Sequence, residues 1–443
     1  MEMMSILPEF GNAILTLIAF VVALSIIVGV HEYGHYIVGR WSGIKAEVFS
    51  IGFGPVLWSR VDRFGTRWQF AAIPFGGYVK FLGDANAASG KDGEAMEELP
   101  EEELRHTMHG APLWARSATV FAGPLFNFIF TILVFAALFL TMGVIQNPPK
   151  VTEVKDIPVQ GIEIEPGDQI MAIEGKPFPD TPDREYFETL PETELLDYTV
   201  TRGGETFTVK GPQYTPPMIG FVQPRSAGEA AGLMAGDYIL EANGEPLESF
   251  RELVRIVKGE GGDPVRLIVL RGAEEKEFVI QPELSDVPTE ENGFEQRWLI
   301  GITSTPFFEA ERERPGLGEA FGLSVERTYD VVVRSVSGLY HLAAGKISSC
   351  NMSGAIGIAR ASKDQAEAGL ESFIGFLALL STAVGFLNLL PIPMLDGGHL
   401  VFYAYEAVTR RKPSDAVMNV LMTLGIALVM SVMIFALWTD ITC

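Results

Sequence analysis

This chain has almost no cysteine, and its basic residues are far outnumbered by acidic ones. Its 443 residues include only two cysteines, Cys350 and Cys443, which are too few for a disulfide-rich scaffold, and the pattern assigns neither a role. Lys and Arg number 33 against 56 Asp and Glu, so the formal net charge is -23. A basic stripe is also missing, and we therefore expect no nucleic-acid partner.

Four long stretches of the chain contain no charged residue. They cover residues 13–30, 117–147, 372–395 and 416–439, and each can cross a bilayer as a helix. The first lacks the basic start and the small-residue cleavage site of a signal peptide, so we expect it to be retained. The sequence therefore predicts an α-helical membrane protein with about four transmembrane helices, for which the lipid bilayer is the first partner.

The first of these stretches is followed directly by His31-Glu32-Tyr33-Gly34-His35. Histidines four residues apart share one face of a helix and can bind one zinc ion. Glu32 is not needed as a ligand and can take a proton from an attacking water. Ionisable side chains at membrane depth are costly and usually functional. The other interpretation is a helix end whose histidines only reach the interface.

The candidate third ligand is Asp396, at the end of the third stretch. Catalytic zinc sites usually have three protein ligands. Pro391 and Pro393 precede Asp396 and cannot both lie in a regular helix. We expect the backbone to unwind there, which a membrane tolerates only inside protein or beside a water-filled cavity. A loop that merely ends a helix is the alternative.

Basic residues near the membrane ends predict the orientation of the chain. They gather between the first two stretches and, as Arg410, Arg411 and Lys412, between the last two; the N-terminal tail and the residues after Thr439 have none. Both loops are therefore expected in the cytoplasm, and both termini and residues 150–371 outside it. The candidate ligands then meet on the cytoplasmic side, as a shared metal requires.

These motifs carry a family resemblance. HEYGH in a first membrane segment, with the sequence from Asn388 to His399 in a late one, resembles the site-2 protease family of intramembrane zinc metalloproteases. The resemblance covers nearly the whole chain and includes residues 52–55, 73–80 and 121–127.

The resemblance implies roles for particular residues. One Zn²⁺ would be bound by His31, His35 and Asp396, with Glu32 as general base and Asn388 contacting the substrate backbone. For a bacterial member it also implies an inner-membrane enzyme with periplasmic PDZ domains, acting on a single-span protein such as an anti-sigma factor, or on remnant signal peptides. An upstream site-1 protease would trim the same substrate first.

Residues 149–215 and 216–284 resemble two PDZ domains. In the second copy, Gly220 and Phe221 begin a strand, Ile239 lies in the next strand, and residues 250–258 predict a helix. PDZ folds bind chain ends at a sheet edge, so these three residues are the expected peptide groove. The first copy lacks a Gly-Leu pair and is degenerate. The other interpretation is a pair of spacers that filter substrates by size, and we favour it over specific binding of a peptide tail.

The cytoplasmic segment at residues 46–81 has strand character. By the resemblance, Gly52, Phe53 and Gly54 would offer a membrane-associated strand edge to an extended substrate, and Pro391 and Pro393 are further candidate substrate-binding residues. A protease needs an exposed peptide bond, and edge pairing compensates the substrate for its lost helical bonds. A purely structural hairpin is the alternative. Residues 316–346 predict either a helix on the outer membrane surface or a core helix of a soluble domain.

The expected parts follow the chain in order. They are 1–40, first transmembrane segment; 41–111, cytoplasmic segment with the β element; 112–148, second transmembrane segment; 149–215 and 216–284, PDZ-like domains; 285–369, linker and surface helix; 370–403, third transmembrane segment; 404–415, cytoplasmic loop; and 416–443, fourth transmembrane segment and tail.

The expected function is hydrolysis of a peptide bond within or beside the transmembrane segment of a pre-trimmed membrane protein. The main rival is a non-catalytic PDZ membrane adaptor with a structural metal, which would need no general base. A second rival is a metal-ion transporter, which would need polar residues along the length of the transmembrane helices, whereas here they cluster at one level.

Overall fold

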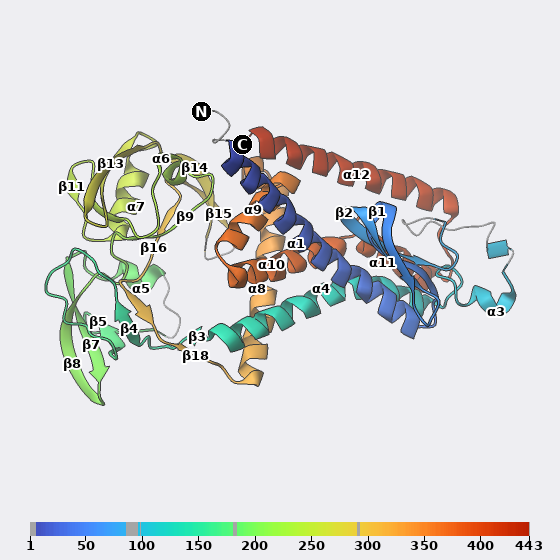
Figure 1. Cartoon of the computed structure of the whole chain (residues 1–443), viewed down its shortest axis with the longest axis horizontal. Coiled ribbons are helices and arrows are strands. Elements are labelled where there is room, and N and C mark those ends of the chain that lie inside the picture. The colour runs from blue at the N-terminus through green and yellow to red at the C-terminus, as the bar shows by residue number, and fades with distance from the viewer. Residues whose placement is uncertain (1–5, 86–95, 98, 180–183, 290–292, 443) are drawn as a thin grey trace. The chain divides into compact units, whose positions relative to one another are not determined.

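The computed structural model describes residues 6–85, 96–97, 99–179, 184–289 and 293–442. They form two compact units, one of Met1–Thr141 with Gly316–Cys443 and one of Met142–Pro315. The first unit is mainly helical and the second is mainly short strands (Figure 1). The chain therefore leaves the helical unit once and returns to it once.

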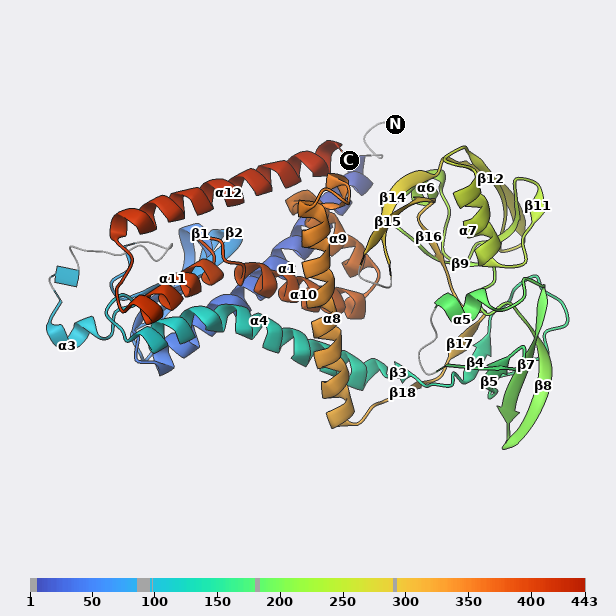
Figure 2. The same cartoon turned by 180° about the vertical axis from the view of Figure 1, so that it is seen from behind.

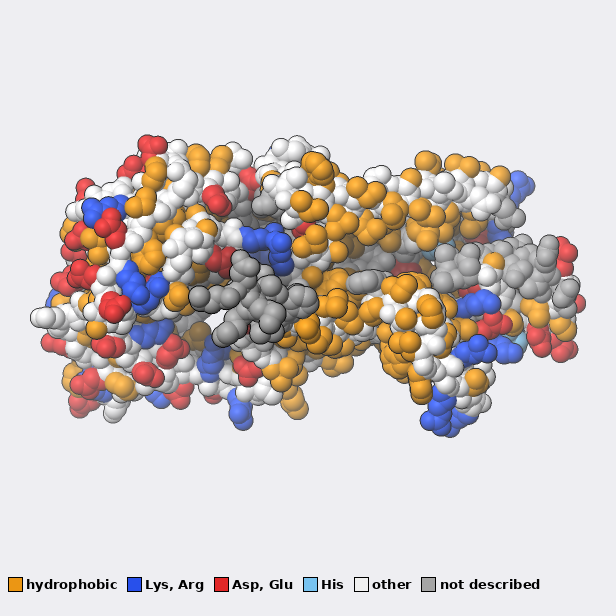
Figure 3. Space-filling view, turned by 45° about the horizontal axis from the view of Figure 1, so that its top comes forward, with side chains coloured by type: hydrophobic (Ala, Val, Ile, Leu, Met, Phe, Trp, Pro, Cys, Tyr) orange, Lys and Arg blue, Asp and Glu red, His pale blue; other side chains and the backbone are white. Residues whose placement is uncertain are grey.

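Four helices of the described residues are long and apolar enough to cross a membrane. They are α1 (Ile6–Trp41), α4 (Leu113–Met142), α10 (Leu370–Asn388) and α12 (Asp415–Thr442). Figure 3 shows hydrophobic side chains gathered over these helices, whereas charged side chains cover much of the second unit. The four predicted helices are confirmed, although α4 stops at Met142 because Gly143 turns the chain with a φ of +73°.

The third apolar stretch unwinds where the sequence predicts. After α10 ends at Asn388, residues 389–395 are not helical, and Asp396 opens α11 (Asp396–Thr409). Met394 in this segment has a φ of +94°. A side chain at Gly397 or Gly398 would collide with backbone carbonyls of the same segment. The two glycines therefore let α11 start directly against the unwound chain.

The predicted strands at residues 46–81 are confirmed as β1 (Ala46–Val61) and β2 (Arg67–Phe81). Residues 46–51 pair with 77–81, residues 48–51 pair also with 67–70, and residues 56–61 pair with 67–71. Gly52 and Gly54, with φ of +94° and +83°, turn the chain between the two halves of β1. Phe53 pairs there with Ile73, so the exposed edge at this turn is short.

The second unit contains two four-stranded sheets with the same strand order. Their orders are β6 (Lys176–Pro177), β5 (Gln169–Ile173), β7 (Leu195–Arg202), β8 (Glu205–Pro212), and β11 (Glu245–Pro246), β10 (Tyr238–Ala242), β12 (Val265–Arg271), β13 (Glu274–Ile280). In both sheets a buried aspartate just before the first strand is hydrogen-bonded to an arginine at the end of a later strand. Asp168, before β5, pairs with Arg202 of β7, and Asp237, before β10, pairs with Arg271 of β12. The two sheets therefore repeat one architecture. Helices α5 (Arg184–Glu188), α6 (Ala227–Ala231) and α7 (Phe250–Gly259) accompany them, and α7 confirms the predicted helix.

The start of the predicted linker at residue 285 is not an unstructured connection. After the hairpin β14 (Glu283–Pro288) and β15 (Phe294–Leu299), three short strands return along the unit. β16 (Ile302–Ser304), β17 (Phe308–Ala310) and β18 (Arg312–Glu313) pair with β9 (Ile219–Val222), β4 (Val151–Val154) and β3 (Val144–Ile145). The prediction of a linker was wrong there because strands of two or three residues are too short to show a period of two.

The predicted peptide groove needs a correction. Gly220 in β9 lies against Ser304, so the return strand covers its outward face. Phe221 is 52% exposed, but Ile239 is fully buried. Ile239 points inward from β10 into a core that includes Leu253 and Leu267. Its side chain therefore packs the domain and is not available to a peptide.

The helical unit is completed by shorter elements and by α8 (Leu317–Ala343), which confirms the predicted helix. α8 exposes Phe321 and Tyr340, which suits a membrane-surface helix better than the core helix of a soluble domain. The other elements are the 3₁₀ helix η1 (Ser349–Asn351) and the helices α3 (Glu101–Leu104) and α9 (Ala355–Glu367). Figure 2 shows α3 and α9 from behind. Cys350 in η1 is disulfide-bonded, so it has a structural role that the sequence left unassigned; Cys443 lies outside the described residues.

Candidate metal centre

The structure brings together the three candidate ligands from opposite ends of the sequence. His31 and His35 lie one turn apart on α1, and Asp396 is the first residue of α11. The Nε2 atoms of the two histidines are 3.1 Å apart. The Asp396 Oδ2 atom lies 3.1 Å from Nε2 of His31 and 3.5 Å from Nε2 of His35. Three ligand atoms thus converge on one point.

This spacing fits a zinc ion. Zinc bonds of about 2.0–2.2 Å in a tetrahedral arrangement place neighbouring ligand atoms about 3.3 Å apart, close to the observed separations. Asp396 Oδ2 is buried and has no hydrogen-bond partner among the described residues. A buried carboxylate oxygen without a partner is costly, and a cation between it and the two imidazoles removes that cost.

Glu32 lies beside the ligands but is not one of them. It is half-buried, and its carboxyl group accepts a hydrogen bond from the backbone N–H of Val79 in β2. A Cβ atom at Gly77 would stand 3.3 Å from the Glu32 Cγ atom, so the absence of a side chain there lets β2 approach. The β element therefore holds the candidate general base in place.

Helix α4 packs directly against the two histidines through glycine. A Cβ atom at Gly123 would overlap His35 Nε2 and stand 2.8 Å from His31 Cε1. Gly34, inside HEYGH, likewise has no room for a side chain beside the Ala122 carbonyl. Glycine at both positions leaves the space that the ligand atoms and a metal occupy.

The same face of α4 contacts the remaining ring nitrogens of both histidines. The Thr119 carbonyl lies 2.8 Å from His35 Nδ1, and the Asn127 side-chain amide lies 3.2 Å from His31 Nδ1. We did not predict roles for Thr119, Gly123 or Asn127. Their spacing of four residues within an apolar stretch was the available signal, because small and polar residues on one helix face mark close packing in membranes.

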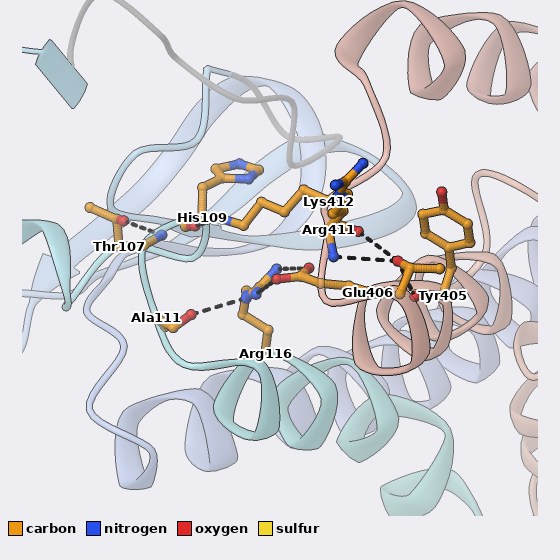
Figure 4. A network of polar contacts seen from close by, with 10 residues as sticks. Thr107, His109, Ala111, Arg116, Tyr405, Glu406, Arg411 and Lys412 are labelled. Atoms are coloured by element: carbon orange, nitrogen blue, oxygen red, sulfur yellow. Dashed lines mark hydrogen bonds and ion pairs between the residues drawn. The ribbon is translucent and has the colours of Figure 1, made fainter.

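An ion pair fixes α11, the helix that carries Asp396, to the start of α4 (Figure 4). The Arg116 guanidinium donates two hydrogen bonds to the Glu406 carboxylate, of 2.7 and 3.0 Å, and a third to the Ala111 carbonyl. Lys412 donates to the His109 carbonyl at 3.1 Å. The Arg116 guanidinium lowers the pKa of Glu406 below its usual range. The bidentate pair orients α11 from the end opposite Asp396.

The candidate substrate-binding residues lie in three places: at the end of α10, in the unwound segment, and in the turn of the β element. Asn388 donates a hydrogen bond to the Val384 carbonyl at 3.0 Å, within its own helix. Pro391 is exposed and Pro393 is half-buried, and Gly425 of α12 lies against the Pro393 carbonyl. Gly52, Phe53 and Gly54 form the turn of the β element described above. A role for any of these residues in substrate binding stays a prediction.

Comparisons with known proteins agree with this geometry. Residues 19–432 match the model of peptidase family M50. A protein of Mesorhizobium japonicum named as a zinc metalloprotease is 35% identical over 432 residues, covering 96% of this chain and 98% of the relative. Proteins named likewise from Rhizobium meliloti and Vibrio cholerae are each 33% identical, with 96% of this chain covered and 96% and 98% of the relatives.

Solved structures that match part of the chain include one described as a PDZ domain. It is a PDZ domain of an SdrC-like protein from Listeria monocytogenes, 22% identical, with 21% of this chain and 92% of that chain covered and a TM-score of 0.18. Since the family model spans almost the whole chain and the relatives match it end to end, this chain belongs to peptidase family M50, the site-2 protease family, and is a zinc metalloprotease.

Proposed function

We propose that this enzyme hydrolyses a peptide bond within or beside the transmembrane segment of its substrate. The observation that carries the proposal is the position of Glu32, which lies next to the ligand set without joining it and is oriented by Val79. A structural metal site needs no such carboxylate. Because the ligands lie on α1 and at the start of α11, the chemistry takes place beside membrane-length helices.

The residues can divide the reaction between them. One zinc ion, bound by His31, His35 and Asp396, would polarise the scissile carbonyl and make water a better nucleophile. Glu32 takes the proton from the attacking water and delivers it to the leaving amine. Asn388, Pro391 and Pro393 hold the substrate backbone in the unwound segment.

A helical substrate hides its carbonyl groups in hydrogen bonds and must unwind before cleavage. We assign the turn at Gly52, Phe53 and Gly54 to this step, since an extended substrate can form backbone hydrogen bonds there. Ile51 is already paired on both sides, with Gly77 and Phe70, so we leave it out of the proposed substrate edge. The edge is therefore limited to Gly52–Gly54.

The two repeated sheets of the second unit are assigned as PDZ-like domains that filter substrates by size. The return strands β16 and β17 occupy one edge of β9 and of β4. Strand addition by a peptide at those edges is blocked, which favours a filter over a tail-binding module.

We place the enzyme in a bacterial inner membrane with the second unit in the periplasm and the metal centre near the cytoplasmic side. The distribution of Lys and Arg supports this orientation. The disulfide of Cys350, which would lie outside the cytoplasm, supports it further, because disulfides persist in oxidising compartments.

The substrate class follows from the resemblance in the order of parts to the bacterial regulator of sigma-E protease. We propose a single-span anti-sigma factor already trimmed by a site-1 protease, in envelope stress signalling, and remnant signal peptides as a second class. The test is incubation of the purified enzyme with single-span model substrates, with and without a zinc chelator. Cleavage inside the apolar segment that stops on chelation is expected; cleavage only in soluble loops would overturn the intramembrane assignment.

A further inference from the structure

The contacts of His35 show which of its two ring nitrogens carries the proton and which is unprotonated and able to bind a metal. Its Nδ1 atom lies 2.8 Å from the Thr119 carbonyl, and a carbonyl only accepts hydrogen bonds. The proton of the neutral ring is therefore on Nδ1, and Nε2 presents its lone pair to the other ligand atoms. This is the tautomer that binds a metal through Nε2.

His31 needs the same tautomer but faces an amide instead of a carbonyl. Its Nδ1 atom lies 3.2 Å from the Asn127 side-chain amide, with Nδ2 as the nearer atom. If Nδ2 donated to Nδ1, the ring proton would sit on Nε2. That atom is 3.1 Å from both His35 Nε2 and Asp396 Oδ2, so the lone pair required for the metal would be lost.

Exchange of the two amide atoms removes this conflict. Oxygen and nitrogen of an amide are nearly equal in size, and their assignment follows from the hydrogen bonds they make. With Oδ1 toward His31, the amide accepts a hydrogen bond from Nδ1–H. In the orientation with Nδ2 toward His31, the buried Oδ1 atom has no hydrogen-bond partner among the described residues, so that orientation satisfies neither the amide oxygen nor the tautomer that His31 needs.

Asn127 is held firmly enough to orient a ring. It is fully buried, and its backbone carbonyl accepts hydrogen bonds from Thr131 Oγ1 at 3.0 Å and Ser381 Oγ at 3.2 Å. A Cβ atom at Gly385 would stand 3.0 Å from the Asn127 Cβ atom. α10, which leads to Asp396, therefore packs on the residue that contacts His31.

We propose that Asn127 is a positioning residue for zinc. Its amide oxygen accepts a hydrogen bond from His31 Nδ1–H, which fixes the tautomer and the ring plane of His31 and couples α1 to the α10 segment that precedes Asp396. The inference rests on the proposed role of His31 as a zinc ligand. It predicts that an acceptor at position 127, not the amide as such, is what zinc binding requires.

The test compares zinc affinity, by chelator competition, in Asn127→Leu and Asn127→Asp. Leucine has a similar size but cannot accept, and we expect a 10–100-fold loss of affinity. Aspartate offers only acceptors, and we expect it to retain zinc within a few-fold of the unaltered enzyme. Ser362→Ala is the control, since it removes a buried hydroxyl of α9 that donates to the Ile358 carbonyl of its own helix, and its zinc affinity should not change.

Each outcome decides the proposal. Unaltered affinity in Asn127→Leu, or loss of zinc in a folded Asn127→Asp, would overturn it, because leucine has no acceptor, whereas aspartate keeps an acceptor oxygen toward His31. If Asn127→Leu does not fold, Asn127→Asp alone decides. His31→Ala distinguishes failure of the zinc-ligand assignment from failure of the role of Asn127. If His31→Ala retains zinc, His31 is not a ligand. If His31→Ala loses zinc while Asn127→Leu keeps its zinc affinity, only the role of Asn127 is wrong.

Discussion

Gly123 of α4 lies directly against His35 of α1, in a position where any side chain would overlap the ring nitrogen that faces the other ligands. The metal centre is thus formed by three elements, although only two of them supply ligands. Helix α4 contributes the wall that is close enough to set the positions of both imidazoles.

Gly123→Ala should therefore disrupt zinc binding. The added methyl group must displace the His35 ring or separate α1 from α4, at a cost of about 1–3 kcal/mol, and we expect zinc affinity to fall more than tenfold. Gly375→Ala in α10 is the control, because a Cβ atom there would meet Leu138 at an ordinary 3.7 Å. Equal zinc content in the two purified variants would contradict the role assigned to Gly123.

Glu32→Gln should keep zinc but lose peptide hydrolysis, because an amide cannot take the proton. His31→Ala, His35→Ala and Asp396→Ala should lose both. Metal analysis and a cleavage assay on the purified variants measure the two effects separately. Glu47→Gln controls for loss of an acid, since Glu47 pairs with Lys80 on the β element. Full activity of Glu32→Gln would remove the general-base role.

The Arg116–Glu406 pair should make stability depend on acid pH. The pKa of Glu406 is lowered from 4.5 in the folded protein, so the stabilisation is complete above about pH 4.5 and disappears as the pH falls through the lowered folded value. Arg116→Met leaves the half-buried carboxylate unpaired and should cost about 3 kcal/mol at neutral pH.

Thermal unfolding at several pH values measures this difference. Glu406→Gln combined with Arg116→Met should recover part of the loss, because the unpaired charge is then absent. A destabilisation by Arg116→Met that persists unchanged at pH 3 would contradict the ion-pair explanation.

Proline in the short edge of the β element should lower cleavage. Phe53→Pro removes a backbone N–H from the edge that we assign to the substrate and restricts its φ angle, whereas Leu57→Pro alters the exposed outer half of β1 and serves as control. Substrates with helix-weakening residues in the membrane segment should be cleaved faster. A cleavage rate that does not change across a helix-propensity series in the substrate would rule out the unwinding step.

Deletion of the second unit should remove the size filter and leave hydrolysis intact. A deletion of residues 151–284 alone would strand β16 and β17 without partners, so residues 143–314 should be replaced by a short flexible linker. The deletion enzyme is expected to cleave both full-length and pre-trimmed substrates. Continued rejection of the full-length substrate would place the filter in the helical unit.

The ligands and the base could be predicted because ionisable side chains carry a high free-energy cost in a membrane and are therefore rare there. His31, Glu32, His35 and Asp396 are conspicuous among apolar neighbours, and the two prolines predict the unwound segment before Asp396. Thr119 and Asn127 could not be assigned, because they act through helix crossing, and the crossing angle is set by glycines whose neighbours lie far away in sequence.

The return strands were missed for a different reason. β16 to β18 are two or three residues long and have no periodicity of their own, because their positions are specified by the strands they join. The burial of Ile239 likewise follows from the direction of one side chain in β10, which depends on register and not on composition.

The pairing of β3 with β18 places Val144 opposite Glu313, so the chain enters and leaves the second unit through adjacent strands. When the two ends of an inserted domain lie side by side, the insertion does not force apart the two chain ends to which it is joined. Evolution can therefore lengthen, shorten or exchange such a cassette at this stem, while the residues that cut peptide bonds stay under separate selection.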